Sequence, residues 1–235
     1  STTISVALTW NATGDDGFTG NLNNSTFTIQ YTSVAAWAQG NSWSTNTATV
    51  PGYVYTVEIA TTGVTAGSQR FRNQTGLAPN TTYFFRLWTK DDVGRYSPLS
   101  NGATASTLAN PVTGAQVYNV FYTSVTVNWQ PRPVSPSSST CEGYKLQVST
   151  SSNFTEVIYS SVTLSVNVST LTIKDLGTNT TYYFRVGSLN WIGEPNYAVA
   201  GSTCTLKPPP GSSPLNPEIS AVFLSSITMK WTSVS

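Results

Sequence analysis

Two pairs of adjacent aspartates are the residues whose type and spacing could bind a metal ion. Asp15 and Asp16 stand in a Gly-Asp-Asp-Gly turn, and Asp91 and Asp92 stand in Lys-Asp-Asp-Val-Gly-Arg. Clustered carboxylates with nearby backbone carbonyls are the oxygen ligands that Ca²⁺ prefers. Aspartate is also a frequent turn former, because its side chain bonds to its own backbone. A calcium site and a pair of structural turns are both open interpretations.

Four aromatic residues form a second candidate site. Trp37, Trp43, Tyr53 and Tyr55 fall in a long stretch rich in Gly, Ser and Thr. Aromatic side chains outside a strand pattern can stack on a sugar ring or contact a protein partner. They can equally cover the edge of a sheet. The four residues are therefore candidates for ligand or partner contact, with the covering role as the alternative.

The residue types present argue against catalysis in this segment. The chain has no histidine, which removes the usual general base and the commonest metal ligand. Cys141 has neither a histidine nor a CxxC partner, so nothing would activate it as a nucleophile. Cys141 and Cys204 could form the disulfide that a lone pair in an extracellular protein usually makes, and their pairing stays open. We expect no enzyme, and no cofactor beyond Ca²⁺.

Charge and hydropathy exclude two classes of partner. Charged residues make up 9% of the chain and the net charge is +1, with no basic cluster. A nucleic-acid-binding protein would carry a positive patch, so DNA and RNA are not expected as partners. No apolar run approaches the length of a membrane span. Serine, threonine, asparagine and glycine supply most of the polar surface.

An internal repeat indicates which structural units position these residues. The segment from Leu77 to Leu108 returns, with the same corner and the same ending, from Leu176 to Leu206. Short segments such as ISVALTW (4–10) and TTYYFRVGSL (180–189) alternate apolar and polar residues, as half-buried strands do. Turn residues separate them, and no stretch has a sustained helical period. The pattern predicts antiparallel β-sandwiches in units of about 100 residues.

The recurring motifs identify a family that the chain resembles. A tryptophan ends the second strand of each unit (Trp10, Trp129, Trp231), and Leu-x-x-Asn-Thr-x-Tyr-x-Phe forms a corner before the sixth. With a closing strand that ends in Thr-Leu, these motifs resemble fibronectin type III domains. The resemblance implies tandem immunoglobulin-like sandwiches, with Trp10 and Trp129 buried between the sheets. It also implies that the loops carrying the four aspartates meet at one pole of the first unit.

Mapping the motifs onto the chain predicts four segments. Residues 1–108 form a sandwich that lacks its first strand, and 109–206 form a complete one. A proline-rich linker spans 207–217, and 218–235 supply the first two strands of a third unit. The join at 109–111 is short, which predicts a fixed angle between the first two units, whereas the second linker predicts more freedom.

The functional expectation rests on the resemblance, because this sandwich serves many proteins as a spacer or binding module. The low charge and the Asn-Thr-Thr-Tyr corner resemble repeats of large bacterial surface proteins. We expect a non-catalytic, extracellular stalk, adhesin or filament. Its partners would be other copies, neighbouring repeats, surface proteins or glycans. The alternatives are an accessory, carbohydrate-contacting region of a secreted polysaccharide-degrading enzyme and a eukaryotic receptor ectodomain.

Overall fold

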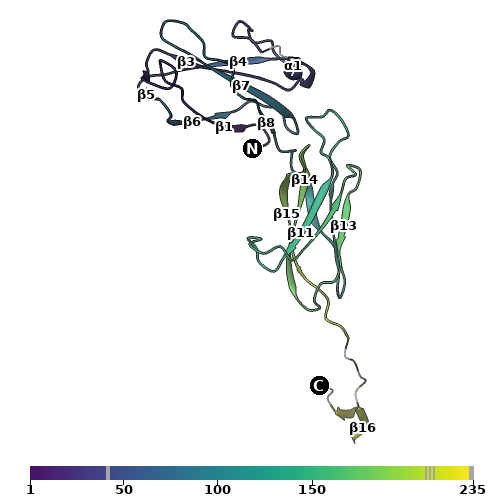
Figure 1. The fold of residues 1–235 in the computed structure, drawn as a ribbon. Coiled ribbons are helices and arrows are strands. Elements are labelled where there is room, and N and C mark those ends of the chain that lie inside the picture. The colour runs from purple at the N-terminus through teal and green to yellow at the C-terminus, as the bar shows by residue number, and fades with distance from the viewer. Residues whose placement is uncertain (41–42, 210, 212, 214, 233–235) are drawn as a thin grey trace.

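The chain folds into two β-sandwiches followed by a small hairpin (Figure 1). A computed structural model describes residues 1–40, 43–209, 211, 213 and 215–232. Within these ranges nearly all of the regular secondary structure is strand, and the one helix is the short α1 (Ala35–Gln39). The predicted all-β class is confirmed.

The first sandwich packs a two-stranded sheet, β1-β6, against a four-stranded antiparallel sheet, β4-β3-β7-β8, with a short pair β2-β5 at one end. On β3, Phe27, Ile29 and Tyr31 enter the core, where Tyr83 and Phe85 of β7 meet them. The strands of this sandwich are β1 (Val6–Asn11), β2 (Asn21–Leu22), β3 (Thr26–Thr32), β4 (Tyr55–Ala60), β5 (Val64–Thr65), β6 (Gln69–Gln74), β7 (Thr82–Lys90) and β8 (Ala103–Ser106).

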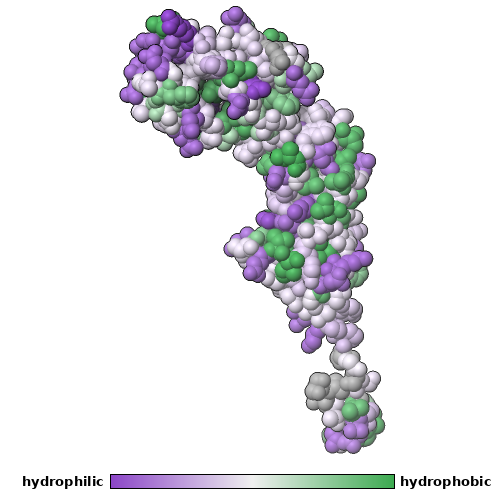
Figure 2. Space-filling model, viewed as in Figure 1, coloured by the Kyte–Doolittle hydropathy of each residue, from purple (hydrophilic) through white to green (hydrophobic). Residues whose placement is uncertain are grey.

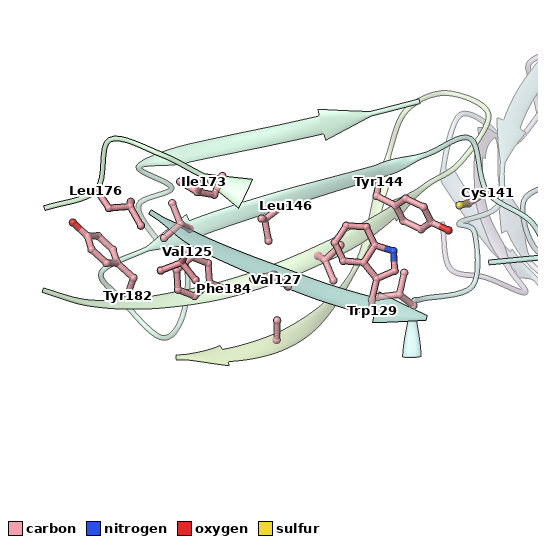
Figure 3. Packing of buried hydrophobic residues seen from close by; sticks show 14 of the residues in the cluster. Val125, Val127, Trp129, Cys141, Tyr144, Leu146, Ile173, Leu176, Tyr182 and Phe184 are labelled. Atoms are coloured by element: carbon pink, nitrogen blue, oxygen red, sulfur yellow. The ribbon is translucent and has the colours of Figure 1, made fainter. Parts of the chain in front are cut away.

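The second sandwich packs β13-β10-β9 against β12-β11-β14-β15. Figure 3 shows its core, in which Trp129 of β10 lies beside Tyr144 of β11, with ring centroids 5.0 Å apart. Val125 and Val127 continue the inward face of β10 and are fully buried. The strands are β9 (Thr113–Val120), β10 (Val125–Gln130), β11 (Tyr144–Ser149), β12 (Tyr159–Thr163), β13 (Thr170–Ile173), β14 (Thr181–Leu189) and β15 (Pro195–Cys204).

The repeated corner motif has the same role in both sandwiches. The hydroxyl of Tyr83 accepts a hydrogen bond from the backbone N–H of Ala78 at 2.8 Å, and Tyr182 accepts one from Gly177 at 3.0 Å. This tyrosine corner ties the start of β7 or β14 to the preceding turn. The closing threonine adds a second tie, because the Thr107 hydroxyl accepts the N–H of Thr81 at 3.0 Å.

The sandwiches differ at one sheet edge. In the second, β9 pairs with β10, whereas in the first no described strand lies on the corresponding edge of β1. Trp129 is consequently only 4% exposed. Trp10 is half-buried and packs edge-on to Phe27 at 5.4 Å. Both tryptophans were predicted to be buried between the sheets; Trp129 is, whereas Trp10 packs against the core but stays partly exposed.

The C-terminal hairpin consists of β16 (Leu215–Val222) and β17 (Ile227–Thr232). The strand β16 begins inside the segment predicted as the 207–217 linker. Among its residues, only Ala221 is partly buried. Large apolar side chains on both strands, including Ile219, Met229 and Trp231, are more than half exposed. Figure 2 shows hydrophobic residues on the surface of this hairpin.

Candidate functional site

The aspartate pole of the first sandwich is a cavity rather than a closed ligand cage. Its volume is about 530 Å³, and it lies between the loop after β1 and the loop after β7. Asp15 and Asp91 line it, together with Arg95 and the aromatic Trp10 and Tyr96. Asp16 and Asp92 do not reach its wall. The two loops therefore lie next to each other, as the sequence analysis expected. Only one aspartate of each pair lines the cavity between them.

The two lining carboxylates have different environments. An oxygen of Asp91 accepts a hydrogen bond from the backbone N–H of Arg95 at 2.6 Å, which closes the turn of its own loop. The Oδ1 atom of Asp15 is shielded from solvent and has no hydrogen-bond partner. This burial, and then the charges of Asp92, Asp16 and Asp91, raise the pKa of Asp15. The charges of the other three aspartates therefore act on Asp15 at this pole.

A metal centre has little geometric support in the described part of the chain. Nowhere in it do three His, Cys, Asp or Glu side chains come close enough to hold a metal ion. Asp91 is engaged as a turn former, as the alternative interpretation expected. Calcium binding by Asp15, Asp16, Asp91 and Asp92 stays a prediction.

The four candidate aromatics separate into three places. Trp37, on α1, packs edge-to-face on Trp43, with centroids 4.6 Å apart, and the guanidinium of Arg86 lies 5.9 Å from the Trp43 ring. Tyr55 instead stacks on Tyr31 at 5.0 Å and belongs to the core. Tyr53 is 44% exposed in a turn. Only Trp37 and Trp43 can therefore act together.

The segment around these tryptophans covers the outer face of β3. The Gln30 amide donates hydrogen bonds to the carbonyl of Ser44 at 2.6 Å and to that of Thr47 at 3.2 Å. Gln30 is completely buried although it points away from the sandwich core. The segment therefore covers a face of the sheet at an inner strand, and not the sheet edge that the alternative interpretation named.

A further polar site, in which side chains of one sandwich hydrogen-bond to the connecting segment, lies at the join of the two sandwiches. Three side chains of the second sandwich donate to backbone carbonyls of the connecting segment. The Asn190 amide donates to Thr107 at 3.0 Å, the Asn196 amide to Ala109 at 2.8 Å, and the Ser188 hydroxyl to Asn110 at 2.6 Å.

The join is also sealed from water. Ala109, Ser188 and Asn190 are each at most 1% exposed. A direct bond between sandwiches adds to them, since the Asn80 amide donates to the Glu142 carboxylate at 3.2 Å. Buried carbonyls need partners, so removing one donor would leave an unsatisfied group. These hydrogen bonds therefore restrain the short connection.

The sequence interpretation did not find these joining residues. The repeat contains the signal, because the second copy has asparagine at 190 and 196 where the first has Asp91 and Ser97. An amide can donate a hydrogen bond, whereas an ionised carboxylate cannot.

Comparison with known proteins decides the family. Residues 110–200 match the fibronectin type III domain family. The second sandwich is a fibronectin type III domain. The first repeats its strand order without the strand that corresponds to β9, so the chain is a tandem of such sandwiches. The recognition made from the tryptophan, corner and Thr-Leu motifs is confirmed.

Two curated relatives are chicken proteins, sidekick-1 and sidekick-2 (Gallus gallus). Each is 27% identical over 161 residues, which cover 66% of this chain but only 7% of the relative. Among solved structures, the FN1–FN3 domains of chicken CNTN1 match with 14% identity and a TM-score of 0.44, over 88% of this chain and 64% of that one. A two-domain chicken tenascin segment matches with 15% identity and a TM-score of 0.38, over 85% and 93%.

The second fibronectin type III domain contains the two cysteines of the chain. Cys141 is buried in the core of the second domain and Cys204 is exposed on β15, and both are free thiols. Burial raises the pKa of the Cys141 thiol, which keeps it protonated and unreactive. None of the described helices is long and apolar enough to cross a membrane.

Proposed function

We propose that this chain is a non-catalytic structural and adhesive segment of a larger extracellular surface protein. In this proposal, residues 1–108 and 109–206 are two fibronectin type III domains, 207–217 link them to a third, and 218–235 begin it. The domains act as a spacer that holds binding surfaces at a set distance and angle. Bacterial origin and a filament remain predictions, and the named relatives are from chicken.

One observation carries the proposal, namely the buried hydrogen bonds at the join. A spacer that only tethers its two ends could have a flexible connection between its domains. Here three carbonyls of the connecting segment are each held by a side chain of the second domain. Such a joint transmits orientation from one domain to the next.

Stretching single molecules between their ends tests whether the domains act as a spacer. Each domain should unfold in one cooperative step, and the second should lengthen the chain by about 30 nm, given the reach of an extended residue. Two discrete steps are expected. A gradual extension without steps would show that the domains do not resist load and would contradict a spacer function.

The second candidate function is carbohydrate contact, favoured by the paired Trp37 and Trp43 beside Arg86. If the pair binds glycans, the full chain should co-sediment with insoluble polysaccharides such as cellulose or chitin. Replacing Trp37 by Ala should then abolish the binding, while Phe71→Ala, at an exposed site on β6, should not. Equal sedimentation of both variants would remove this candidate.

A further inference from the structure

The second domain has an oriented arginine on the outer face of its four-stranded sheet. Phe184 of β14 and Leu146 of β11 point into the core (Figure 3). The next residues along these strands, Arg185 and Gln147, therefore point to the opposite side of the sheet. They are partners across the two strands, and the Arg185 Nε–H donates to the Gln147 Oε1 atom at 2.9 Å. This bond fixes the guanidinium above the outer face.

Two aromatic rings pack against the same guanidinium. Its Cζ atom lies 4.0 Å from the ring centroid of Tyr197 on β15 and 4.4 Å from that of Phe154 in the loop after β11. At these distances the ring faces attract the cation. Arg185 is thus held by Gln147 and by two rings, and loses little further freedom when it binds another group.

The backbone is shaped to bring both rings to this place. Phe154 has a φ of 55°, in the left-handed region that bulky residues seldom adopt. Tyr197 lies over Gly187, where a Cβ atom would come within 3.0 Å of the ring. The first domain has Trp88 at the position of Gly187 in the repeat. The clamp around Arg185 therefore depends on two features that are particular to the second domain.

The first domain has the same glutamine–arginine pair, but its own chain satisfies it. Gln30 faces Arg86 across β3 and β7, at the positions of Gln147 and Arg185 in the repeat. The Gln30 amide donates to two carbonyls of the segment near Ser44, which covers it. Arg86 donates through Nη1 to a carbonyl of the loop between β7 and β8 at 2.9 Å. A covering segment is thus an occupant that this face of the fold accepts.

In the second domain the pair has no such cover. Among the described residues, neither the Nη atoms of Arg185 nor the amide nitrogen of Gln147 has a hydrogen-bond partner, and neither is sealed from solvent. Burial, and then Glu194, raise the pKa of Tyr197, so one carboxylate stands nearby. It makes no ion pair with Arg185, because the one ion pair in the described part of the chain lies in the hairpin. Arg185 and Gln147 can therefore both donate to an external group.

The surroundings of the pair define what that group should be. Lys145 is the other charged residue on this face, and none of the strands β11, β12, β14 and β15 contains Asp or Glu. Val199 is opposite Arg185 and is 71% exposed, and Val162 is opposite Lys145 and is 53% exposed. Positive charge beside exposed apolar side chains fits an anionic group with apolar neighbours.

We propose that this face of the second domain binds a segment of a protein partner that carries an acidic side chain. The carboxylate accepts from the Arg185 Nη atoms, a backbone carbonyl beside it accepts from the Gln147 amide, and flanking apolar residues cover Val199. Both rings already turn a face to the guanidinium, which favours a protein carboxylate over a stacked sugar. The site rests on the adhesive part of the proposed function, whereas the spacer role does not depend on it.

A nuclear magnetic resonance titration of the ¹⁵N-labelled full chain tests the site. The probe is the blocked peptide acetyl-Val-Glu-Val-amide, and acetyl-Val-Gln-Val-amide is its uncharged control. The acidic peptide should cause saturable shifts of the Arg185 Nε–H, the Gln147 side-chain amide and the Val199 backbone amide, severalfold larger than those with the control. The Nε–H of Arg86 is an internal reference and should not move, because its domain covers the corresponding face.

Two variants separate binding from folding. Arg185→Lys keeps the charge but loses the fork of donors, so it should weaken binding of the acidic peptide severalfold. Phe154→Gly removes one ring and suits the left-handed backbone, so it should keep the melting temperature or raise it while also weakening binding. Lys174→Gln, just after β13 in the opposite sheet, should leave binding unchanged.

Three results would overturn the proposal. They are equal shifts with both peptides, an Arg86 shift that matches the one at Arg185, and no Arg185 shift up to the solubility limit of the acidic peptide. Unchanged binding by Arg185→Lys would contradict it as well. None of these outcomes bears on the spacer role, which the stretching experiment tests separately.

Discussion

At the scale of single residues, Trp10 and Trp129 show how one motif acquires two environments. Both end the second strand of a sandwich, but only Trp129 is covered by a neighbouring strand. Replacing Trp129 by Ala should lower the free energy of unfolding of its domain by about 3–5 kcal/mol, as for other buried aromatics. Trp10→Ala should cost clearly less. Denaturant titration of both variants checks the order, and equal losses would contradict the open edge of β1.

Asp15 predicts a pH dependence whose sign follows from its raised pKa. Burial and three neighbouring aspartates make the folded first domain bind a proton more tightly than the unfolded chain does. Stability should therefore fall as pH rises from the ordinary carboxyl range through the folded pKa. Asp15→Asn should raise the melting temperature at pH 7, and the gain should vanish below the ordinary carboxyl range. A variant that is less stable at pH 7 would show that the ionised carboxylate is needed.

Calcium is the separate prediction for the same pole. If Asp15, Asp16, Asp91 and Asp92 bind Ca²⁺, millimolar calcium should raise the melting temperature of the first domain by mass action on the folded state. The double variant Asp15→Asn, Asp92→Asn should remove the shift. Calorimetry that detects neither heat nor stabilisation would leave the aspartates as turn formers.

At the scale of elements, the sequence predicted what is repeated better than what is unique. Period-two alternation located the strands, and the Tyr83 and Tyr182 corners were evident from two copies of one motif. A covering role for the segment near Ser44 was an expected alternative, but its contact with Gln30 on β3 could not be predicted, because a backbone carbonyl carries no residue-specific signal. Tyr55 was misplaced for the opposite reason, since its alternation with Val57 on β4 already indicated the core.

The site was predicted less completely than the fold. The meeting of two loops at one pole follows from topology, and Asp15 and Asp91 do line the same cavity. Which atoms face that cavity depends on side-chain directions that spacing alone does not determine. The joining residues Ser188, Asn190 and Asn196 were missed because their partners are backbone carbonyls, which every residue carries.

At the scale of the whole molecule, the two domains follow each other with a bend at a short, buried join (Figure 1). The rigidity of this join is the central claim, because a spacer with a set angle depends on it. The substitution Asn190→Asp tests this rigidity with a side chain of nearly the same shape. It keeps the Oδ1 acceptor for the N–H groups of Ile192 and Glu194, but removes the donor to Thr107.

Distances between spin labels on the two domains, measured by pulsed electron–electron double resonance, test this claim most directly. Labels are attached to Asn73→Cys on β6 and Lys174→Cys after β13, both at exposed sites, in the Cys204→Ser full chain. We predict one narrow distance distribution, which Asn190→Asp broadens while both domains stay folded. A distribution that is already broad with the native asparagine would contradict the fixed joint, and with it the proposed spacer.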